Sequence, residues 1–273
     1  MIKQGTMKQD LSKKVETSSF QSRNTTADRA IDVLMLFNDQ RLVLTAEDVA
    51  EQLGMSRSTT YRYLQSLRSY GLIEEGNANG EFRLGPAILR LGHVARKGLG
   101  LSEVALPVMH ELVAKTGESA LLTRRSGNYV VCIERVESEH RVRLSYERGQ
   151  VMPLHAGASA KVLLAFLKPA EIEAMLSTVP LTRYTEHTTT DAMTLRAQLA
   201  AIREARYVVT EGEVDIGVRG VAAPIFGVNG QVLAGISVAG LTYRLSEAVL
   251  PSVIQAVREA ALIISQRLSD LDM

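Results

Sequence analysis

The chain has 273 residues, of which 46% are hydrophobic and 22% charged, and its net charge is +1. This composition is typical of a globular protein large enough for two domains, and it excludes nucleic-acid binding through overall positive charge alone. The single cysteine, Cys132, excludes an internal disulfide framework. No apolar run is long enough to span a bilayer, and the N-terminus lacks signal-peptide character. We therefore expect a cytoplasmic protein without membrane contacts.

The first 24 residues are rich in Lys, Gln, Ser and Thr and show no apolar periodicity, so we expect residues 1–24 to form a disordered tail. Order is expected to begin with a helix that Thr25 and Thr26 cap. One face of this helix is apolar and comprises Ala27, Ala30, Ile31, Leu34 and Phe37.

The next segment has the spacing of a helix-turn-helix. Thr45 and Asp48 form an N-cap signature, Gly54 ends the short helix that follows, and Ser56 caps a second helix from Arg57 to Tyr70. This second helix has an apolar face opposite a polar one, which is typical of a helix that enters the major groove. The predicted DNA-contacting residues are Ser56, Arg57, Ser58, Thr59, Tyr61, Arg62, Gln65 and Arg68. The alternative is an ordinary pair of antiparallel helices with an exposed basic face.

Two strand-like runs follow at 72–74 and 81–84, joined by a turn rich in Gly and Asn. A helix-turn-helix followed by a β-hairpin is a winged helix, which we assign to residues 25–85. Pro86 suits the first turn of a helix, and we assign residues 86–101 to a linker helix between two domains.

The remaining residues, 102–273, are predicted to form one α+β domain. After a helix capped by Ser102, strands are expected at 119–124, 129–136, 142–146, 207–211, 218–226 and 231–239. Helices are expected at 162–167, 169–177, 194–206 and 246–268. Hairpins rather than βαβ repeats indicate a mostly antiparallel sheet flanked by helices.

Two neighbouring strands of this domain carry stripes of small side chains. With a period of two, the stripes are Val218, Gly220 and Ala222 on one strand, and Gly235, Ser237 and Ala239 on the other. Small side chains either leave room for a ligand or let a helix pack closely, and the pattern alone does not choose between them. Residues 157–161 lead into a helix whose free N–H groups and positive dipole end attract a carboxylate, and Ser159 adds a hydroxyl donor.

Catalytic and metal-binding patterns are weak. Cys132 and His155 lack the local signature of a thiol nucleophile, and Ser159 and Lys161 have the spacing S-x-K rather than S-x-x-K. The five histidines include no helical H-x-x-x-H pair. Glu213 and Asp215 are interpreted as the solvated charges of a turn. We therefore expect no catalytic residue, no metal site and no cofactor.

From residue 25 onward the chain resembles the IclR family of bacterial transcriptional regulators. Besides the helix-turn-helix, the resemblance is carried by 29–34 (RAIDVL), 81–86 (EFRLGP), 154–161 (LHAGASAK), 211–226 (EGEVDIGVRGVAAPIF) and 236–240 (ISVAG). It implies a winged helix that reads a double-stranded, palindromic operator, a linker helix, and a GAF-like domain that binds a small organic or aromatic acid. It also implies homodimers or homotetramers.

The resemblance places effector contacts at Ala158, Ser159, Thr210, Val218, Gly220, Ser237 and Ala239. We add Leu144, Tyr146 and Met152 as apolar walls. The sequence departs from the family pattern at Thr60 and Tyr63, where aliphatic residues are usual, and at Tyr61, where histidine is common.

We therefore expect a transcriptional regulator, a repressor rather than an activator, whose operator binding responds to a small carboxylate or aromatic acid. The alternatives are an enzyme that processes a small molecule and carries an appended winged helix, and a winged helix that contacts protein instead of DNA.

Overall fold

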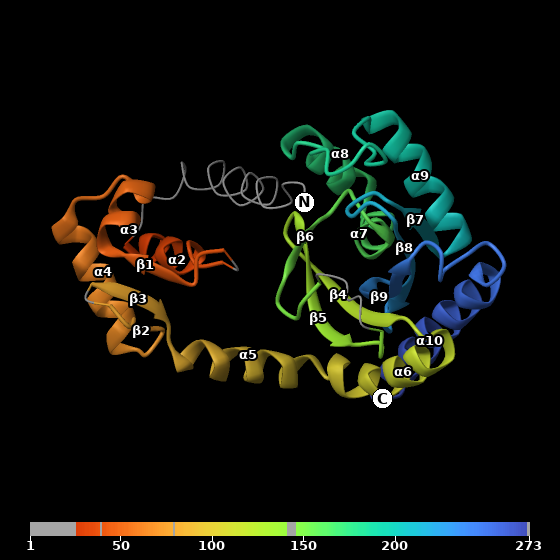
Figure 1. Cartoon of the computed structure of the whole chain (residues 1–273), viewed down its shortest axis with the longest axis horizontal. Coiled ribbons are helices and arrows are strands. Elements are labelled where there is room, and N and C mark those ends of the chain that lie inside the picture. Colours follow the sequence, from red (N-terminus) through yellow and green to blue (C-terminus); the bar gives the residue numbers. More distant parts are fainter. Residues whose placement is uncertain (1–25, 39, 79, 141–145, 272–273) are drawn as a thin grey trace. The chain divides into compact units, whose positions relative to one another are not determined.

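The computed structural model describes residues 26–38, 40–78, 80–140 and 146–271 (Figure 1). The chain divides into two compact units between Ala95 and Arg96, inside helix α5 (Pro86–Leu99). The predicted tail therefore lies outside the described residues.

The N-terminal unit is a winged helix. Its elements are α2 (Thr26–Met35), β1 (Val43–Thr45), α3 (Ala46–Leu53), α4 (Arg57–Ser69), β2 (Ile73–Glu75) and β3 (Glu81–Leu84). The strands form an antiparallel sheet in the order β1-β3-β2. Residues Val43–Thr45, which the sequence analysis did not assign to a strand, form the third strand, in which Leu44 enters the core beside Phe82.

The local signals at the helix-turn-helix act as predicted. The N–H of Asp48 donates to Thr45 Oγ1 (3.1 Å), and the N–H of Thr45 donates to Asp48 Oδ2 (2.7 Å), which completes a capping box. Gly54 ends α3 with φ +61°, a left-handed conformation that glycine adopts without steric strain. Ser56 caps α4 by accepting from the N–H of Thr59 at 3.2 Å. These caps fix where each helix begins and therefore which face α4 exposes.

The C-terminal unit is built on a six-stranded antiparallel sheet. In spatial order its strands are β6 (Val151–Pro153), β5 (Tyr129–Val136), β4 (Ser119–Ser126), β9 (Val232–Leu241), β8 (Val218–Phe226) and β7 (Val208–Glu211). Helices α6 (Leu101–Thr116) and α10 (Leu250–Leu271) cover one face of the sheet. Helix α7 (Ala158–Leu164) covers the other, backed by α8 (Pro169–Thr178) and α9 (Ala192–Ala205).

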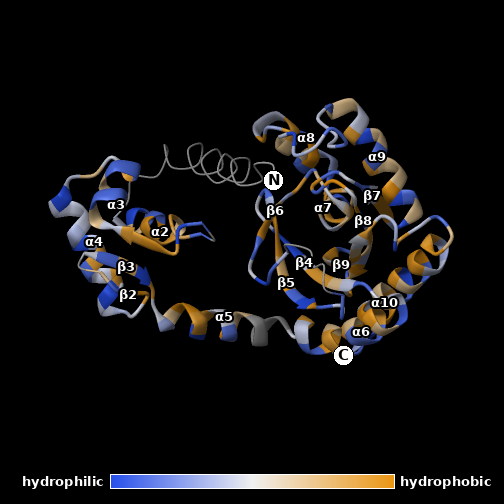
Figure 2. Cartoon of the chain, viewed as in Figure 1, coloured by the Kyte–Doolittle hydropathy of each residue, from blue (hydrophilic) through white to orange (hydrophobic). Residues whose placement is uncertain are grey.

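Alternation along the strands divides the buried side chains between two cores. In β4, for example, Ala120 and Leu122 face α6 and α10, whereas Leu121 faces the side of α7. The sheet therefore packs against hydrophobic side chains on both faces, and Figure 2 shows the hydrophobic colour along much of β4. Among the described residues, no helix is both long and apolar enough to cross a membrane.

Several predicted boundaries need correction. The helix expected at 162–167 begins at Ala158, because the chain turns directly from Gly157 (φ +84°) into helical conformation. Ser102 does not cap α6: Gly100 occupies the cap position, and Ser102 is buried inside the helix. The last helix begins at Leu250 rather than 246. Strand β6 was not predicted, and most of the strand expected at 142–146 lies outside the described residues.

Candidate nucleic-acid interface and ligand pocket

The polar face of α4 is exposed along its length. Ser58, Tyr61, Arg62 and Gln65 are exposed, whereas the opposite face is buried in the unit's core. Thr60 is fully buried in that core, and its hydroxyl donates to the carbonyl of Ser56 at 3.1 Å. This local bond explains how a threonine can stand among aliphatic side chains.

Not all of the predicted contact residues are equally available to DNA. The hydroxyls of Ser56 and Thr59 lie 2.9 Å apart and bond to each other at the start of α4. The guanidinium of Arg62 lies over the ring of Tyr63, 5.8 Å from its centroid, on the exposed side of the helix. Arg62 therefore lies on the exposed side of α4, and among the described residues no carboxylate forms an ion pair with it, in contrast to Arg57 and Arg68.

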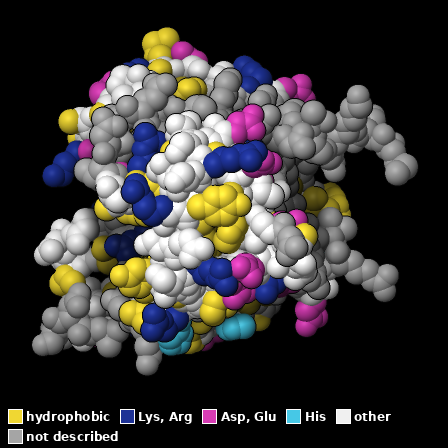
Figure 3. Space-filling model, turned by 90° about the vertical axis from the view of Figure 1, so that its left-hand side faces the viewer, with side chains coloured by type: hydrophobic (Ala, Val, Ile, Leu, Met, Phe, Trp, Pro, Cys, Tyr) yellow, Lys and Arg dark blue, Asp and Glu magenta, His cyan; other side chains and the backbone are white. Residues whose placement is uncertain are grey.

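The fold places a carboxylate beside each of the other two arginines of α4. Arg57, at the start of the helix, pairs with Glu47 of α3, and Arg68, in the last turn, pairs with Glu75 of β2 at 2.7 Å. The two glutamates therefore offset part of the positive charge at the two ends of the helix. Figure 3, which faces the side of the N-terminal unit, shows basic side chains scattered among polar ones with acidic side chains beside some of them.

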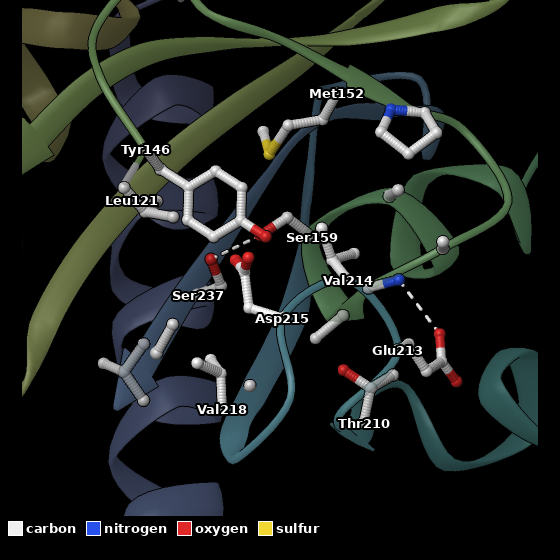
Figure 4. A pocket seen from close by; sticks show the side chains of 18 residues that line it. Leu121, Tyr146, Met152, Ser159, Thr210, Glu213, Val214, Asp215, Val218 and Ser237 are labelled. Carbon is white, nitrogen blue, oxygen red and sulfur yellow. Dashed lines mark hydrogen bonds between the residues drawn. The ribbon is translucent and has the colours of Figure 1, made fainter. Parts of the chain in front are cut away.

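The C-terminal unit contains a small pocket between α7 and the sheet, with a cavity of about 50 Å³ (Figure 4). Nine of the ten predicted effector residues line it, and the tenth, Leu144, lies outside the described residues. These nine are Tyr146, Met152, Ala158, Ser159, Thr210, Val218, Gly220, Ser237 and Ala239.

A hydrogen bond crosses the pocket. The hydroxyls of Ser159, on α7, and Ser237, on β9, lie 2.7 Å apart. Because the two residues are far apart in the chain, this bond joins the helix to the sheet directly. Either hydroxyl is able to donate in it.

Both interpretations of the small-residue stripes hold, each at different positions. A Cβ atom on Gly220 would lie 3.1 Å from the Cβ of Ala158, and one on Gly235 would lie 3.0 Å from a methyl carbon of Val162. These glycines let α7 approach the sheet closely. Ser237 and Ala239 instead line the open space.

The interpretation of Glu213 as a solvated charge is wrong. Its side chain is buried, forms an ion pair with Lys161, and accepts a hydrogen bond from the N–H of Gly157 at 2.9 Å. Lys161 is itself only 1% exposed and also donates to Gln198 at 2.8 Å. Burial lowers the pKa of Lys161, and the neighbouring carboxylate of Glu213 opposes this shift. The pair ties the start of α7 to the loop that follows β7.

Asp215, which the sequence analysis also dismissed, lines the pocket. Its carboxylate lies near the hydroxyl of Tyr146 (Figure 4), and burial together with this negative charge raises the pKa of Tyr146 well above its usual value. The hydroxyl of Tyr146 therefore remains protonated at physiological pH. No periodic signal marks a turn residue as inward-facing, so the sequence pattern did not find Asp215.

Cys132 and His155 do not form a catalytic pair in the structure. Burial raises the pKa of the Cys132 thiol to about 11, and the thiol donates to the carbonyl of Glu134. His155 lies 3.0 Å from the carbonyl of Thr182 through Nε2 and stacks on Tyr184. Within the described residues there is no group of three or more metal-ligating side chains.

Comparison with known proteins gives matches over both units. The model of the IclR helix-turn-helix domain matches residues 26–76, and that of the bacterial transcriptional regulator IclR C-terminal domain matches residues 93–266. Among curated proteins, the HTH-type transcriptional regulator BhcR of Paracoccus denitrificans is 36% identical over 86% of this chain and 84% of its own length. The HTH-type transcriptional repressor AllR of Salmonella typhimurium is 30% identical over 88% of this chain and 89% of its own.

Solved structures agree with the described fold. A putative IclR transcriptional regulator from Silicibacter superposes with a TM-score of 0.83 at 29% identity, covering 90% of this chain and 96% of that one. An IclR homologue from Microbacterium hydrocarbonoxydans, solved in complex with 4-hydroxybenzoate, has a TM-score of 0.78 at 32% identity and covers 89% and 99% of the two chains.

Proposed function

The chain belongs to the IclR family of bacterial transcriptional regulators, and on this basis we propose that it is a repressor whose hold on a palindromic operator is controlled by a small organic or aromatic acid. The observation that carries the proposal is the pocket in which Ser159 of α7 and Ser237 of β9 meet at 2.7 Å. A ligand inserted there contacts the helix and the sheet at once. Repression is supported by the name of AllR, a repressor that aligns over most of the chain.

Helix α4 is the element that contacts DNA in this proposal. Arg62 contacts base edges in the major groove, Ser58 and Gln65 contribute hydrogen bonds, and Arg57 and Arg68 lie toward the phosphates. One such helix offers few base contacts, and two-fold pairing on a palindrome doubles them.

A homodimer, or a tetramer built from two, is supported by helix α5. Its Leu89, Leu91 and Val94 side chains are 77%, 53% and 60% exposed in the single chain. Large apolar side chains that are this exposed are typical of a helix that another subunit covers. Light scattering at micromolar concentration should find a dimer or larger species, and a monomer with and without DNA would contradict this assignment.

The effector is a small acid whose carboxylate lies by the backbone N–H groups of Ala158 and Ser159, with the two serine hydroxyls beside it. The Microbacterium homologue with 4-hydroxybenzoate supports this ligand class. A cavity of about 50 Å³ is smaller than the roughly 150 Å³ that accommodates benzene in an engineered protein. An aromatic acid would therefore have to widen the pocket, whereas a short aliphatic acid needs less movement.

Control of DNA binding follows from competition inside the pocket. An acid that bonds to Ser159 and Ser237 replaces the bond between them, and so favours one spacing of helix and sheet over another. A ligand shifts an equilibrium only by its difference in affinity for the two states. The coupling to the operator is therefore limited by how differently the two arrangements bind the acid.

The test uses Ser237→Leu, which fills the cavity, beside Ser237→Ala, which removes the hydroxyl and leaves the space. Calorimetric titration of acids should find no binding to Ser237→Leu and weakened binding to Ser237→Ala. Operator titration should find that Ser237→Leu still binds DNA but no longer responds to the acid. Unchanged affinity and an intact response would place the effector elsewhere. Recovery of chemically altered ligand would instead favour the enzyme alternative.

A further inference from the structure

The charged side chains that line the pocket are all acidic. Among the described residues that line it there are two carboxylates, Glu213 and Asp215, and no lysine, arginine or histidine. Glu213 is compensated from behind by Lys161 and by the N–H of Gly157. The uncompensated charge that faces the ligand space is therefore that of Asp215.

The side-chain oxygens of Tyr146, Ser159, Asp215 and Ser237 converge on one side of the pocket (Figure 4). The two serine hydroxyls bond to each other, and the hydroxyl of Tyr146 lies near the carboxylate of Asp215. An ionised carboxylate only accepts hydrogen bonds, and it has room for more than one donor. Asp215 thus retains accepting capacity toward whatever occupies the space between it and Ser237.

This arrangement distinguishes between acids. A plain carboxylic acid brings a second negative charge close to the partly buried carboxylate of Asp215, and the two like charges repel at this short distance. An acid with a hydroxyl or ammonium group turned toward Asp215 converts that contact into a charge-assisted hydrogen bond. Sites built around a polar partner strongly reject analogues that lack the matching group, because the buried polar group is then left unpaired.

We propose that Asp215 is the specificity-determining residue of the pocket, and that the effector is an acid that also carries a hydrogen-bond donor, a hydroxy or amino acid, presented to this carboxylate. The inference rests on the proposed function, because it refines the ligand class of the same pocket. Asp215 thus gains a role that the sequence analysis did not assign, because it had interpreted this residue as a solvated charge of a turn.

The experiment compares two series of acids in which a hydroxyl or an amino group replaces a hydrogen of the plain acid; the amino group of alanine is a charged ammonium, whereas that of 4-aminobenzoate is neutral. Propionate, lactate and alanine form one series, and benzoate, 4-hydroxybenzoate and 4-aminobenzoate form another. Calorimetric titration of the full-length protein should show at least one donor-bearing member binding ten times more tightly than the plain acid of its series. The hydroxy and amino arms show which donor is preferred.

Asp215→Asn keeps the shape of the side chain and removes its charge. The preference should fall at least tenfold, because the plain acid binds more tightly and the donor-bearing acid more weakly. Asp215→Ser is a second neutral variant, in case the amide disturbs the turn. Glu186→Gln removes the same charge from a side chain that is 80% exposed and lies outside the pocket lining, and should leave the preference unchanged.

The outcomes separate the two claims. If acids bind, Ser237→Leu abolishes their binding, and the preference is absent or persists in both neutral variants, the role of Asp215 is overturned while the pocket assignment stands. If no acid of either series binds, or Ser237→Leu binds them as the natural protein does, the pocket assignment itself fails and this inference fails with it.

Discussion

At the two ends of α4, arginines pair with glutamates on the surface, whereas beneath α7 a lysine pairs with a glutamate in the interior. Side chains of the Arg57–Glu47 pair are 74% and 69% exposed, and those of Lys161–Glu213 are 2% and 10% exposed. Water and salt screen the first pair, which can exchange its partner for a phosphate at little cost. The second pair has no such alternative. The exposed ion pairs at the ends of α4 can therefore exchange a carboxylate for another anion, whereas the buried Lys161–Glu213 pair holds the start of α7 to the loop after β7.

The strongest test of this comparison is to break the interior pair. Lys161→Met should lower the free energy of unfolding of the C-terminal unit by about 3–5 kcal/mol, because Glu213 is left buried without a counter-charge. Chemical denaturation followed by circular dichroism measures the loss. Arg196→Met, which breaks the exposed Arg196–Glu173 pair of the same unit, should leave it nearly unchanged, because solvent screens this pair. Equal losses for the two variants would remove the distinction between the pairs.

On the exposed face of α4 the largest effect on DNA binding is expected for Arg62, which forms no ion pair with the described residues. Arg62→Ala should weaken operator binding by about 1–3 kcal/mol and relax the base preference, because a base contact is lost. Titration of operator and random duplexes by fluorescence anisotropy measures both effects. The loss should be much smaller on random DNA, and an equal loss on both duplexes would argue against base reading by Arg62.

The bond that crosses the pocket should have a smaller effect. Ser159→Ala should reduce effector affinity by about 0.5–1.5 kcal/mol, the value of one neutral hydrogen bond. Calorimetric titration checks this figure, with operator affinity in the absence of effector as the control. A complete loss of binding would mean that Ser159 does more than donate one bond.

The smallest effect is expected where an exposed arginine is already paired. Arg68→Ala should weaken operator and random DNA alike and reduce the salt dependence by about one charge at most. Glu75→Gln, which releases Arg68 from its carboxylate, should shift both properties in the opposite direction. A salt dependence that neither variant alters would show that Arg68 makes no phosphate contact.

Sequence reasoning succeeded where the signal is local or periodic. Thr45, Gly54 and Ser56 set the helix ends through their own backbone neighbours, and the period of two placed Gly220 and Ser237 on the inner face of the sheet. These features depend on residues a few positions apart, so the pattern contains them.

It failed where the partner is distant in the chain. Lys161 and Glu213 are separated by 52 residues, and neither position looks buried in sequence because both side chains are charged. Glu75 lies only seven positions from Arg68, but a glutamate at the end of a strand does not indicate which helix it faces. Asp215 lies in a turn, where no alternation says which side chains point inward. Charge pairing and turn orientation both arise from tertiary packing.

The close approach of α7 to the sheet determines which pocket positions can be mutated to turn this protein into a biosensor for a different ligand. A Cβ atom added at Gly220 or Gly235 would lie 3.1 Å from Ala158 or 3.0 Å from Val162, so α7 would have to shift slightly to accept any larger residue there. Substitutions at these two glycines therefore change the packing of the helix on the sheet as well as the pocket. Diversity belongs on Leu121, Met152 and Val218, which line the pocket away from that contact. The ligand preference can therefore be changed at these lining side chains, whereas the glycines that contact α7 are constrained by the packing of the fold.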